Sequence, residues 1–163
     1  MDDIRVSRMD RAAALAVVGW RYPPPYDFYT LSDDPAATAA FLADAESGYF
    51  QLRDGAGQLV AFCCYGEEAR VPGGDYDAPA LDFGIGVRPD LVGRGQGMRY
   101  LVPVLRFGAT AHRPQLLRLT VATFNQRAIR LYRRAGFQEA SRFASRFASQ
   151  AYLIMTLPVE ALP

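Results

Sequence analysis

The spacing of apolar and polar residues changes repeatedly between a helical period and a strand period, which predicts a mixed α/β protein. Apolar residues recur at helical spacing over residues 10–20, from Ser32 or Asp33 to about Ser47, and over residues 98–111 and 125–135. Strands are expected at residues 4–6, 49–53, 59–65, 81–87, 117–123 and 151–157.

Capping and turn residues predict where several of these elements begin and end. Asp10 and Asn125 are suited to begin helices, because their side chains can accept hydrogen bonds from amides of the first turn. Gly136 is the expected end of the last helix, and the turn at residues 54–57 joins two strands into an antiparallel hairpin. Pro103 falls inside the third helix and is expected to kink it or shift its start.

The composition narrows the class of protein. The chain has 163 residues, of which 50% are hydrophobic and 21% charged, as is usual for a soluble globular domain. No run approaches the roughly 18 apolar residues of a membrane span, and the acidic start lacks the pattern of a signal peptide. The neighbouring Cys63 and Cys64 are expected to be reduced strand residues. These features predict a cytoplasmic protein with one domain over residues 1–163.

Charge is distributed unevenly, although the formal net charge is only +1. All 18 basic residues are arginine, and the lack of lysine excludes a P-loop and lysine-based covalent chemistry. Residues 91–138 hold nine arginines and no acid, whereas residues 1–90 have a net charge of −8. This pattern predicts a specific polyanionic ligand, and a merely solvated basic face is the alternative. Nucleic acid is disfavoured as a partner, because proteins that bind it non-specifically are usually basic throughout.

A glycine-rich loop follows the strand at residues 81–87 and leads into the third helix. Gly93, Gly95 and Gly97 leave no side chains between the loop amides and an anion, and a helix N-terminus favours negative charge. The acid-free stretch that follows lacks the carboxylate that a nicotinamide dinucleotide site needs about 20 residues further on. The loop therefore predicts a site for another pyrophosphate-containing ligand.

Two segments resemble the sequence signatures of the GNAT superfamily of N-acetyltransferases. They are Val87-Arg88-Pro89-Asp90 with Gly93-Arg94-Gly95-Gln96-Gly97, and Asn125, Ala128, Leu131-Tyr132 and Ala135-Gly136-Phe137. The resemblance implies a mixed, mostly antiparallel central sheet of about six or seven strands with about four helices, splayed between the strands at 81–87 and 117–123. It also implies acetyl-CoA as co-substrate, no metal, and direct acetyl transfer to a primary amine in a ternary complex.

The resemblance further implies which residues would bind acetyl-CoA. Loop amides would hold the pyrophosphate, whereas the backbone of the strand before the loop and Asn125 would hold the pantetheine arm. The residues concerned are Ile85, Gly86, Val87, Val92, Gly93, Arg94, Gly95, Gln96, Gly97, Met98 and Asn125. Tyr132 lies where the family often has a general acid, and a phenol beside the thioester sulfur is a suitable proton donor. Packing in the core is the alternative role for Tyr132.

The sequence leaves the general base open. Many members of the family carry a glutamate at the position of Leu81, and the side chain of the neighbouring Asp82 points to the other face of a regular strand. Asp82 is the candidate in the strand itself. Glu67, Glu68, Asp27 and a relayed water are alternatives, and the amine could also arrive deprotonated.

The segment from Tyr22 to Tyr29 is expected to face the acceptor. Its prolines exclude a helix, and Tyr26, Asp27 and Tyr29 combine aromatic rings with a carboxylate, which suits a cationic amine. Packing of these rings into the core is the alternative. The acceptor would be a small molecule or a protein N-terminus, and the protein could form a homodimer. A non-catalytic acyl-CoA-binding module is the rival function on the same fold.

Overall fold

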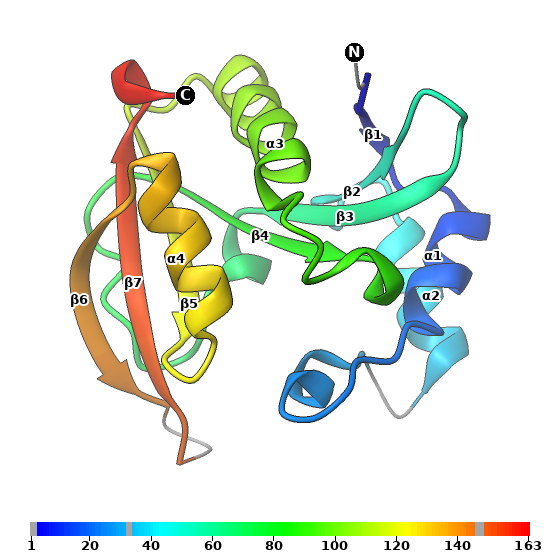
Figure 1. The fold of residues 1–163 in the computed structure, drawn as a ribbon, viewed down its shortest axis with the longest axis horizontal. Helices are drawn as coiled ribbons and strands as arrows, with labels where there is room; N and C mark the ends of the chain where they lie inside the picture. Colours follow the sequence, from blue (N-terminus) through cyan, green and yellow to red (C-terminus); the bar gives the residue numbers. More distant parts are fainter. Residues whose placement is uncertain (1–2, 32–33, 146–148) are drawn as a thin grey trace. The chain divides into compact units, whose positions relative to one another are not determined.

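Over residues 3–31, 34–145 and 149–163, which the computed structural model describes, the chain forms four α-helices and seven β-strands (Figure 1). The helices are α1 (Arg11–Val18), α2 (Pro35–Ala43), α3 (Gly97–His112) and α4 (Gln126–Ala135). The strands are β1 (Arg5–Arg8), β2 (Tyr49–Arg53), β3 (Leu59–Tyr65), β4 (Leu81–Val87), β5 (Leu116–Ala122), β6 (Gln138–Ala144) and β7 (Ala151–Pro158).

The strands follow one another in the order β1-β2-β3-β4-β5-β7-β6. The pairs β1–β2, β2–β3, β5–β7 and β6–β7 are antiparallel, and β4 runs parallel to β5. A parallel pair needs a crossover connection, which contains helix α3 here. The mixed, mostly antiparallel sheet confirms the predicted fold class.

The chain divides into two compact units, each built from two separate stretches. Unit 1 consists of Met1–Cys64 and Ile85–Pro103, and unit 2 consists of Tyr65–Gly84 and Val104–Pro163. Strand β4 and helix α3 each contribute to both units. Strand β4 pairs with β5 at its first two residues, inside unit 2, so the predicted splay beyond them stays a prediction. The prediction of a single domain likewise stays a prediction.

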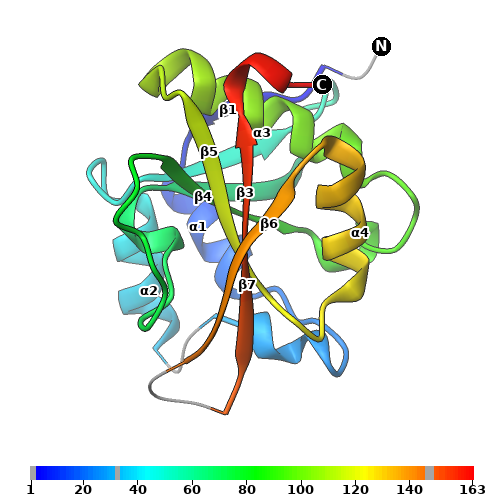
Figure 2. The same cartoon turned by 90° about the vertical axis from the view of Figure 1, so that its left-hand side faces the viewer.

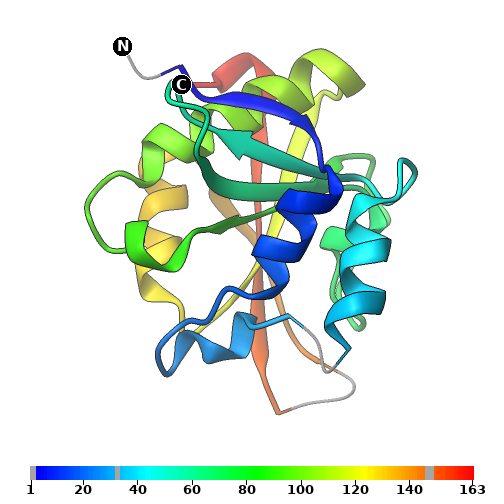
Figure 3. The same cartoon turned by 90° about the vertical axis from the view of Figure 1, so that its right-hand side faces the viewer.

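In unit 1, helices α1 and α2 pack on each other beside the hairpin of β2 and β3 (Figure 3). Asp10 begins α1 as predicted, because its carboxylate accepts a hydrogen bond from the Ala13 N–H at 2.7 Å. This hydrogen bond lowers the pKa of Asp10. The buried core of the helix pair consists of Met9, Ala13, Ala14, Val17, Val18, Ala39 and Leu42.

Helix α2 is shorter than predicted. Asp34 caps it by accepting a hydrogen bond from the Ala37 N–H, whereas the predicted caps, Ser32 and Asp33, lie outside the described residues. The helix ends at Ala43 rather than near Ser47. The reason is local, because the Ser47 hydroxyl donates to the Leu42 carbonyl at 3.2 Å and so closes a turn.

In unit 2, strands β5, β7 and β6 lie side by side with β7 in the middle (Figure 2). Asn125 begins α4 as predicted, since its side chain accepts a hydrogen bond from the Ala128 N–H at 3.1 Å. Gly136 ends this helix as predicted with a φ of 106°, which side chains disfavour. Residues 138–144 form a full strand that was not predicted from the alternation of apolar residues.

Helix α3 runs without interruption through Pro103. It begins at Gly97, directly after the glycine loop, so the proline does not shift its start. Among the described residues, no helix combines the length and the apolar character that crossing a membrane would require.

Candidate acyl-CoA and acceptor site

The loop between β4 and α3 has the backbone geometry of an anion site. Gly93 and Gly95 have positive φ angles of 77° and 73°, a region that side chains disfavour. A Cβ atom added at Gly95 would meet nothing within 4 Å, so the space at this position is open. Helix α3 begins two residues later at Gly97, and the amides of a helix N-terminus attract an anion. The loop therefore fits a pyrophosphate group.

An ion pair between Arg88 and Asp90 lies between the end of β4 and the glycines of this loop. The Nε and Nη2 groups of Arg88 donate to the two carboxylate oxygens of Asp90 at 2.6 and 3.1 Å, and Nη1 donates to the Leu59 carbonyl at 2.8 Å. Hydrogen bonding from Arg88 lowers the pKa of Asp90. Asp90 is the last acid before the acid-free stretch. Its negative charge beside the loop is compensated by the ion pair with Arg88.

The other end of the loop is attached to the first turn of α3. The hydroxyl of the buried Tyr100 donates to Gln96 Oε1 at 3.2 Å, and the Arg99 N–H donates to the Gln96 carbonyl at 3.0 Å. These two bonds hold Gln96 on a rigid element. A loop that is ordered before its ligand arrives loses less conformational entropy on binding.

The last residues of β4 present backbone groups on two edges. The Arg88 N–H donates to the Val60 carbonyl of β3 at 2.9 Å. Because successive backbone groups of a strand point to opposite edges, those of Ile85 and Val87 point away from β3. Gly86 has a packing role, since a Cβ atom there would lie 2.3 Å from the ring of Phe62. Ile85 and Val87 are therefore the residues suited to pair with an extended ligand.

Tyr22, the first residue of the segment expected to face the acceptor, binds one of these backbone groups, a contact that the sequence did not predict. Its hydroxyl donates to the Val87 carbonyl at 2.8 Å, which connects the start of the aromatic segment with the end of β4. Burial raises the pKa of Tyr22 to about 12, so the hydroxyl remains a proton donor at neutral pH. The proline-rich context gave no signal for this contact, because the two residues are 65 positions apart.

The segment expected to face the acceptor was predicted to contain no helix, and this was wrong, because a short 3₁₀ helix at Tyr26–Tyr29 follows directly after the prolines. None of the residues of this helix is buried. The ring of Phe28 is 47% exposed and packs edge-on against Tyr29, with ring centroids 5.1 Å apart. Trp20 and Leu31, on either side of the segment, pack against the core of α1 and α2. The flanks therefore attach the segment, while Tyr26, Asp27 and Tyr29 stay outside the buried core.

Asn125 and Tyr132 both belong to unit 2, at the start and in the last turns of α4. Tyr132 is 9% exposed and packs edge-on against Phe137, with ring centroids 6.0 Å apart. Asn125 is engaged as the helix cap. Asn125 and Tyr132 thus have structural roles. Their contacts with acetyl-CoA stay predictions.

Asp82, the predicted candidate for the general base, lies in a buried ion pair. It is 2% exposed, and its two carboxylate oxygens accept hydrogen bonds from Nε and Nη2 of Arg118 at 2.6 and 2.8 Å. Arg70 Nε donates to the same carboxylate at 2.9 Å. The bond to Asp82 raises the pKa of Arg118. Both oxygens are held by guanidinium groups, which gives Asp82 a structural role, and its predicted role as a base stays a prediction.

Other candidate chemistry in the described part of the chain is limited. No group of three or more His, Cys, Asp and Glu residues there could hold a metal ion. Cys63 and Cys64 are buried side chains of β3. Glu67 and Glu68, the alternative bases in unit 2, are exposed.

Comparison with known proteins identifies the family. The fold defines a mixed α/β protein in which a glycine-rich loop connects a central strand with a helix. The family model described as "Acetyltransferase (GNAT) family" matches residues 14–137, which include the glycine loop, Asn125 and Tyr132. The chain belongs to the GNAT family of acetyltransferases.

The relatives agree with this assignment. The N-alpha-acetyltransferase RimI of Mycobacterium tuberculosis is 37% identical over 111 residues, which cover 66% of this chain and 65% of that relative. The match thus spans slightly less than two thirds of the relative's length.

Solved structures share the fold. A GNAT-family acetyltransferase from Bacillus anthracis superposes with a TM-score of 0.75 at 12% identity and covers 96% of this chain and 95% of its own. The spermidine/spermine N-acetyltransferase SpeG from Vibrio cholerae gives a TM-score of 0.69 at 18% identity, with 98% and 93% covered.

Proposed function

We propose that the protein is an acetyl-CoA-dependent N-acetyltransferase that transfers an acetyl group directly to a primary amine within a ternary complex. The observation that carries the proposal is the glycine loop, with its two positive φ angles and open space at Gly95 immediately before α3. Membership of the GNAT family supports it. The names of RimI and SpeG indicate acceptors of two kinds, a protein N-terminus and a polyamine.

Residues of both units have roles in this proposal. Acetyl-CoA would supply an activated thioester, and the chain would bind and orient it. The pyrophosphate contacts would come from amides of Val92, Gly93, Arg94, Gly95, Gln96, Gly97 and Met98. Ile85 and Val87 would pair with the pantetheine arm, and Asn125 would fix it further along. Orientation of the two substrates would supply much of the rate enhancement.

The proposed acetyl transfer needs two proton transfers, one from Tyr132 to the leaving thiolate and one from the amine to water. Tyr132 would give its phenolic proton to the departing thiolate sulfur as the carbon–sulfur bond breaks and the amine nitrogen bonds to the acetyl carbon. With Asp82 held by Arg118 and Arg70, a relayed water would deprotonate the amine, or the amine would enter as the neutral base. In either case the nitrogen loses one more proton as the amide forms, and this proton would pass through water and restore the phenol of Tyr132. We expect the rate to rise with pH until the acceptor amine is deprotonated.

Binding of acyl-CoA without catalysis is the second candidate function. Two observations favour it, namely Leu81 at the family's usual glutamate position and the buried ion pair of the neighbouring Asp82. This candidate predicts acetyl-CoA affinity but no release of CoA thiol with any amine.

The test is a calorimetric titration with acetyl-CoA, with CoA, NAD and a short DNA duplex as comparators. We expect selective binding of CoA compounds and, in the variant Gly95→Glu, a loss of affinity on the order of 100-fold, because a carboxylate would occupy the anion site. Gly57→Glu is the matched control, since Gly57 also has a positive φ and open space but lies in the β2–β3 turn. Equal affinities of the two variants would contradict the loop assignment. A subsequent amine screen by thiol release separates the enzyme from the binding module.

A further inference from the structure

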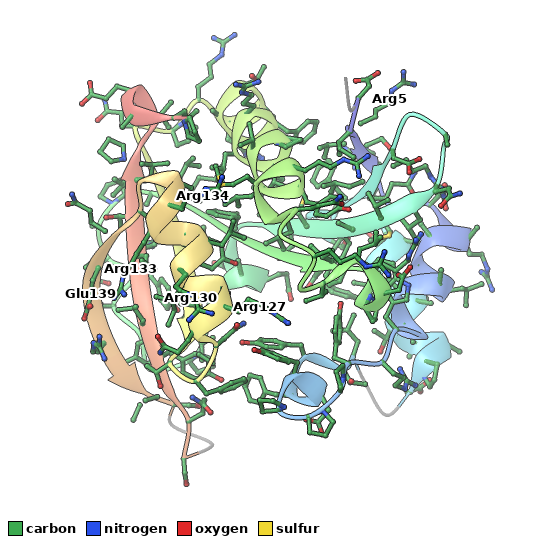
Figure 4. The ribbon with its side chains drawn as sticks, in the orientation of Figure 1. Arg5, Arg127, Arg130, Arg133, Arg134 and Glu139 are labelled. Carbon is green, nitrogen blue, oxygen red and sulfur yellow. The ribbon has the colours of Figure 1, made fainter. Side chains whose placement is uncertain are left out.

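The outward side of helix α4 carries a group of exposed arginines, which we call the arginine face: Arg130, Arg133 and Arg134 (Figure 4). At about 100° per residue these three side chains lie within an arc of about 100° on one side of the helix. The buried residues Ile129, Tyr132 and Ala135 occupy the opposite side. The arginine face is therefore not needed to attach α4 to unit 2.

Helix energetics explain only part of this face. Arg133 and Arg134 lie in the last turn, where the helix dipole favours cations. Arg130 lies in the middle of the helix, with Arg133 and Arg134 three and four residues away, a spacing at which like charges destabilise a helix. Helix α4 contains no acid that could offset this repulsion. Arg130 therefore destabilises helix α4, and no residue of the helix offsets this effect.

The nearest acid in the sequence does not neutralise the face either. Glu139, at the start of β6, accepts hydrogen bonds from both Nε and Nη2 of Arg142, so its carboxylate is already paired. Hydrogen bonding from Arg142 lowers the pKa of Glu139, with a smaller contribution from Arg133. The arginine face therefore keeps a positive charge that a partner could neutralise.

We propose that the arginine face is the docking surface for an acidic segment of a protein acceptor. The proposal rests on the N-acetyltransferase function proposed above and selects between its two kinds of acceptor. Guanidinium groups bind carboxylates through charge-assisted hydrogen bonds, and complementary charges give specificity and faster association. A polyamine carries the same sign of charge and would be repelled.

Charge complementarity also favours a peptide over nucleic acid. Three arginines neutralise few phosphates, whereas affinity for nucleic acid depends on releasing many counterions. Three exposed arginines can instead pair with the carboxylates of a short acidic segment.

The test compares two peptide acceptors with identical N-terminal residues, one followed by an acidic segment and the other by the same segment with Gln in place of each acid. The variant is Arg130→Gln/Arg133→Gln/Arg134→Gln. The control is Arg5→Gln/Arg11→Gln/Arg113→Gln, which removes three exposed arginines from other parts of the chain. We expect the variant to raise KM for the acidic peptide about tenfold, with kcat, KM for the neutral peptide and KM for acetyl-CoA unchanged. The control should match the wild type, and salt at about 0.3 M should reduce the preference.

Binding is measured separately so that docking does not depend on turnover. Fluorescence anisotropy with the same two peptides, blocked at the N-terminus by an acetyl group, should show the acidic preference even if no amine is acetylated. Equal binding of both blocked peptides to the wild type would overturn the docking proposal while leaving the proposed activity intact. A rise in KM for acetyl-CoA in the variant would instead assign these arginines to the phosphates of the co-substrate. Loss in the variant of salt-sensitive binding to single-stranded RNA, without a preference between the peptides, would assign them to nucleic acid.

Discussion

At the scale of single residues, two tyrosine side chains combine a structural contact with a proposed role. Tyr132 is buried against Phe137, and Tyr22 donates to the Val87 carbonyl, so both hydroxyl groups project from rings that are partly or fully enclosed. Enclosure fixes the position of a hydroxyl group and removes competing water. Substitution by phenylalanine removes only this hydroxyl group.

Tyr132→Phe should lower kcat by about 100-fold while KM for acetyl-CoA changes little, because the phenol is proposed to act as a proton donor rather than as a binding group. Steady-state kinetics with thiol detection measure this. Tyr152→Phe is the control, since Tyr152 is equally buried at 9% exposure, on β7. A Tyr132→Phe enzyme with full activity would make Tyr132 a packing residue.

Tyr22→Phe should raise KM for the acceptor several-fold and leave KM for acetyl-CoA nearly unchanged, because it releases the aromatic segment from the end of β4. The lost hydrogen bond should also cost about 1 kcal/mol of unfolding free energy. A variant with unchanged acceptor kinetics would show that the segment does not position the amine.

The same variant should change the dependence of stability on pH. The pKa of Tyr22 in the folded protein, about 12, lies above its usual value of 10.0, so folding favours the neutral phenol. This contribution is complete below about pH 10 and is lost as pH rises through about 12. Urea unfolding between these pH values should therefore show a steeper loss of stability for the wild type than for Tyr22→Phe. Parallel curves would contradict the burial of this hydroxyl group.

At the scale of elements, the parallel pairing of β4 with β5 is held by side chains as well as by the backbone. Asp82 lies opposite Arg118 in the register, and the guanidinium group of Arg118 also donates to the Ala78 carbonyl at 2.8 Å. Two guanidinium groups lie near the ring of Tyr76, those of Arg70 and Arg118, at 5.3 and 5.1 Å from the ring centroid. This network joins the loop before β4 to the strand pair.

Asp82→Asn should lower the free energy of unfolding by about 3 kcal/mol, because it leaves the buried Arg118 cation without its counter-charge. Denaturant unfolding measures the loss, and the exposed pair of Glu139 and Arg142 provides the control in Glu139→Gln, for which little change is expected. At a temperature where the variant is folded, its pH–rate profile should match that of the wild type. Loss of the acidic, rising limb of that profile would instead support Asp82 as the base.

At the scale of the whole molecule, the two units share elements rather than being joined by a linker. Strand β4 and helix α3 contribute to both, so neither unit can lose its structure without affecting an element of the other. Shared elements favour cooperative unfolding.

Unfolding should therefore proceed in one transition. Fluorescence of Trp20, the only tryptophan and a residue of unit 1, should follow the same denaturant curve as far-UV circular dichroism. Asp82→Asn, a change in unit 2, should shift both curves by the same amount. A shift confined to circular dichroism would show that the units unfold independently.

Much of the fold and of the loop could be predicted because the signals are local. The caps Asp10 and Asn125, the stop at Gly136 and the β2–β3 hairpin depend on neighbouring residues, and the structure confirms each of them. The end of α2 and strand β6 were missed. A side-chain bond from Ser47 decides the first, and pairing with β7 decides the second, so neither leaves a clear periodic signal.

The sequence by itself determined the mixed α/β class, the glycine loop before α3 and the family signatures, because these depend on the order and spacing of nearby residues. Only the tertiary structure decided that Asp82 is engaged by Arg118, and that Tyr22 donates to Val87. These partners are 36 and 65 residues apart, and no local pattern specifies such a pairing. The physical reason is that register and packing between distant segments arise from burial summed over the whole core, which decides whether a polar side chain meets water or another residue.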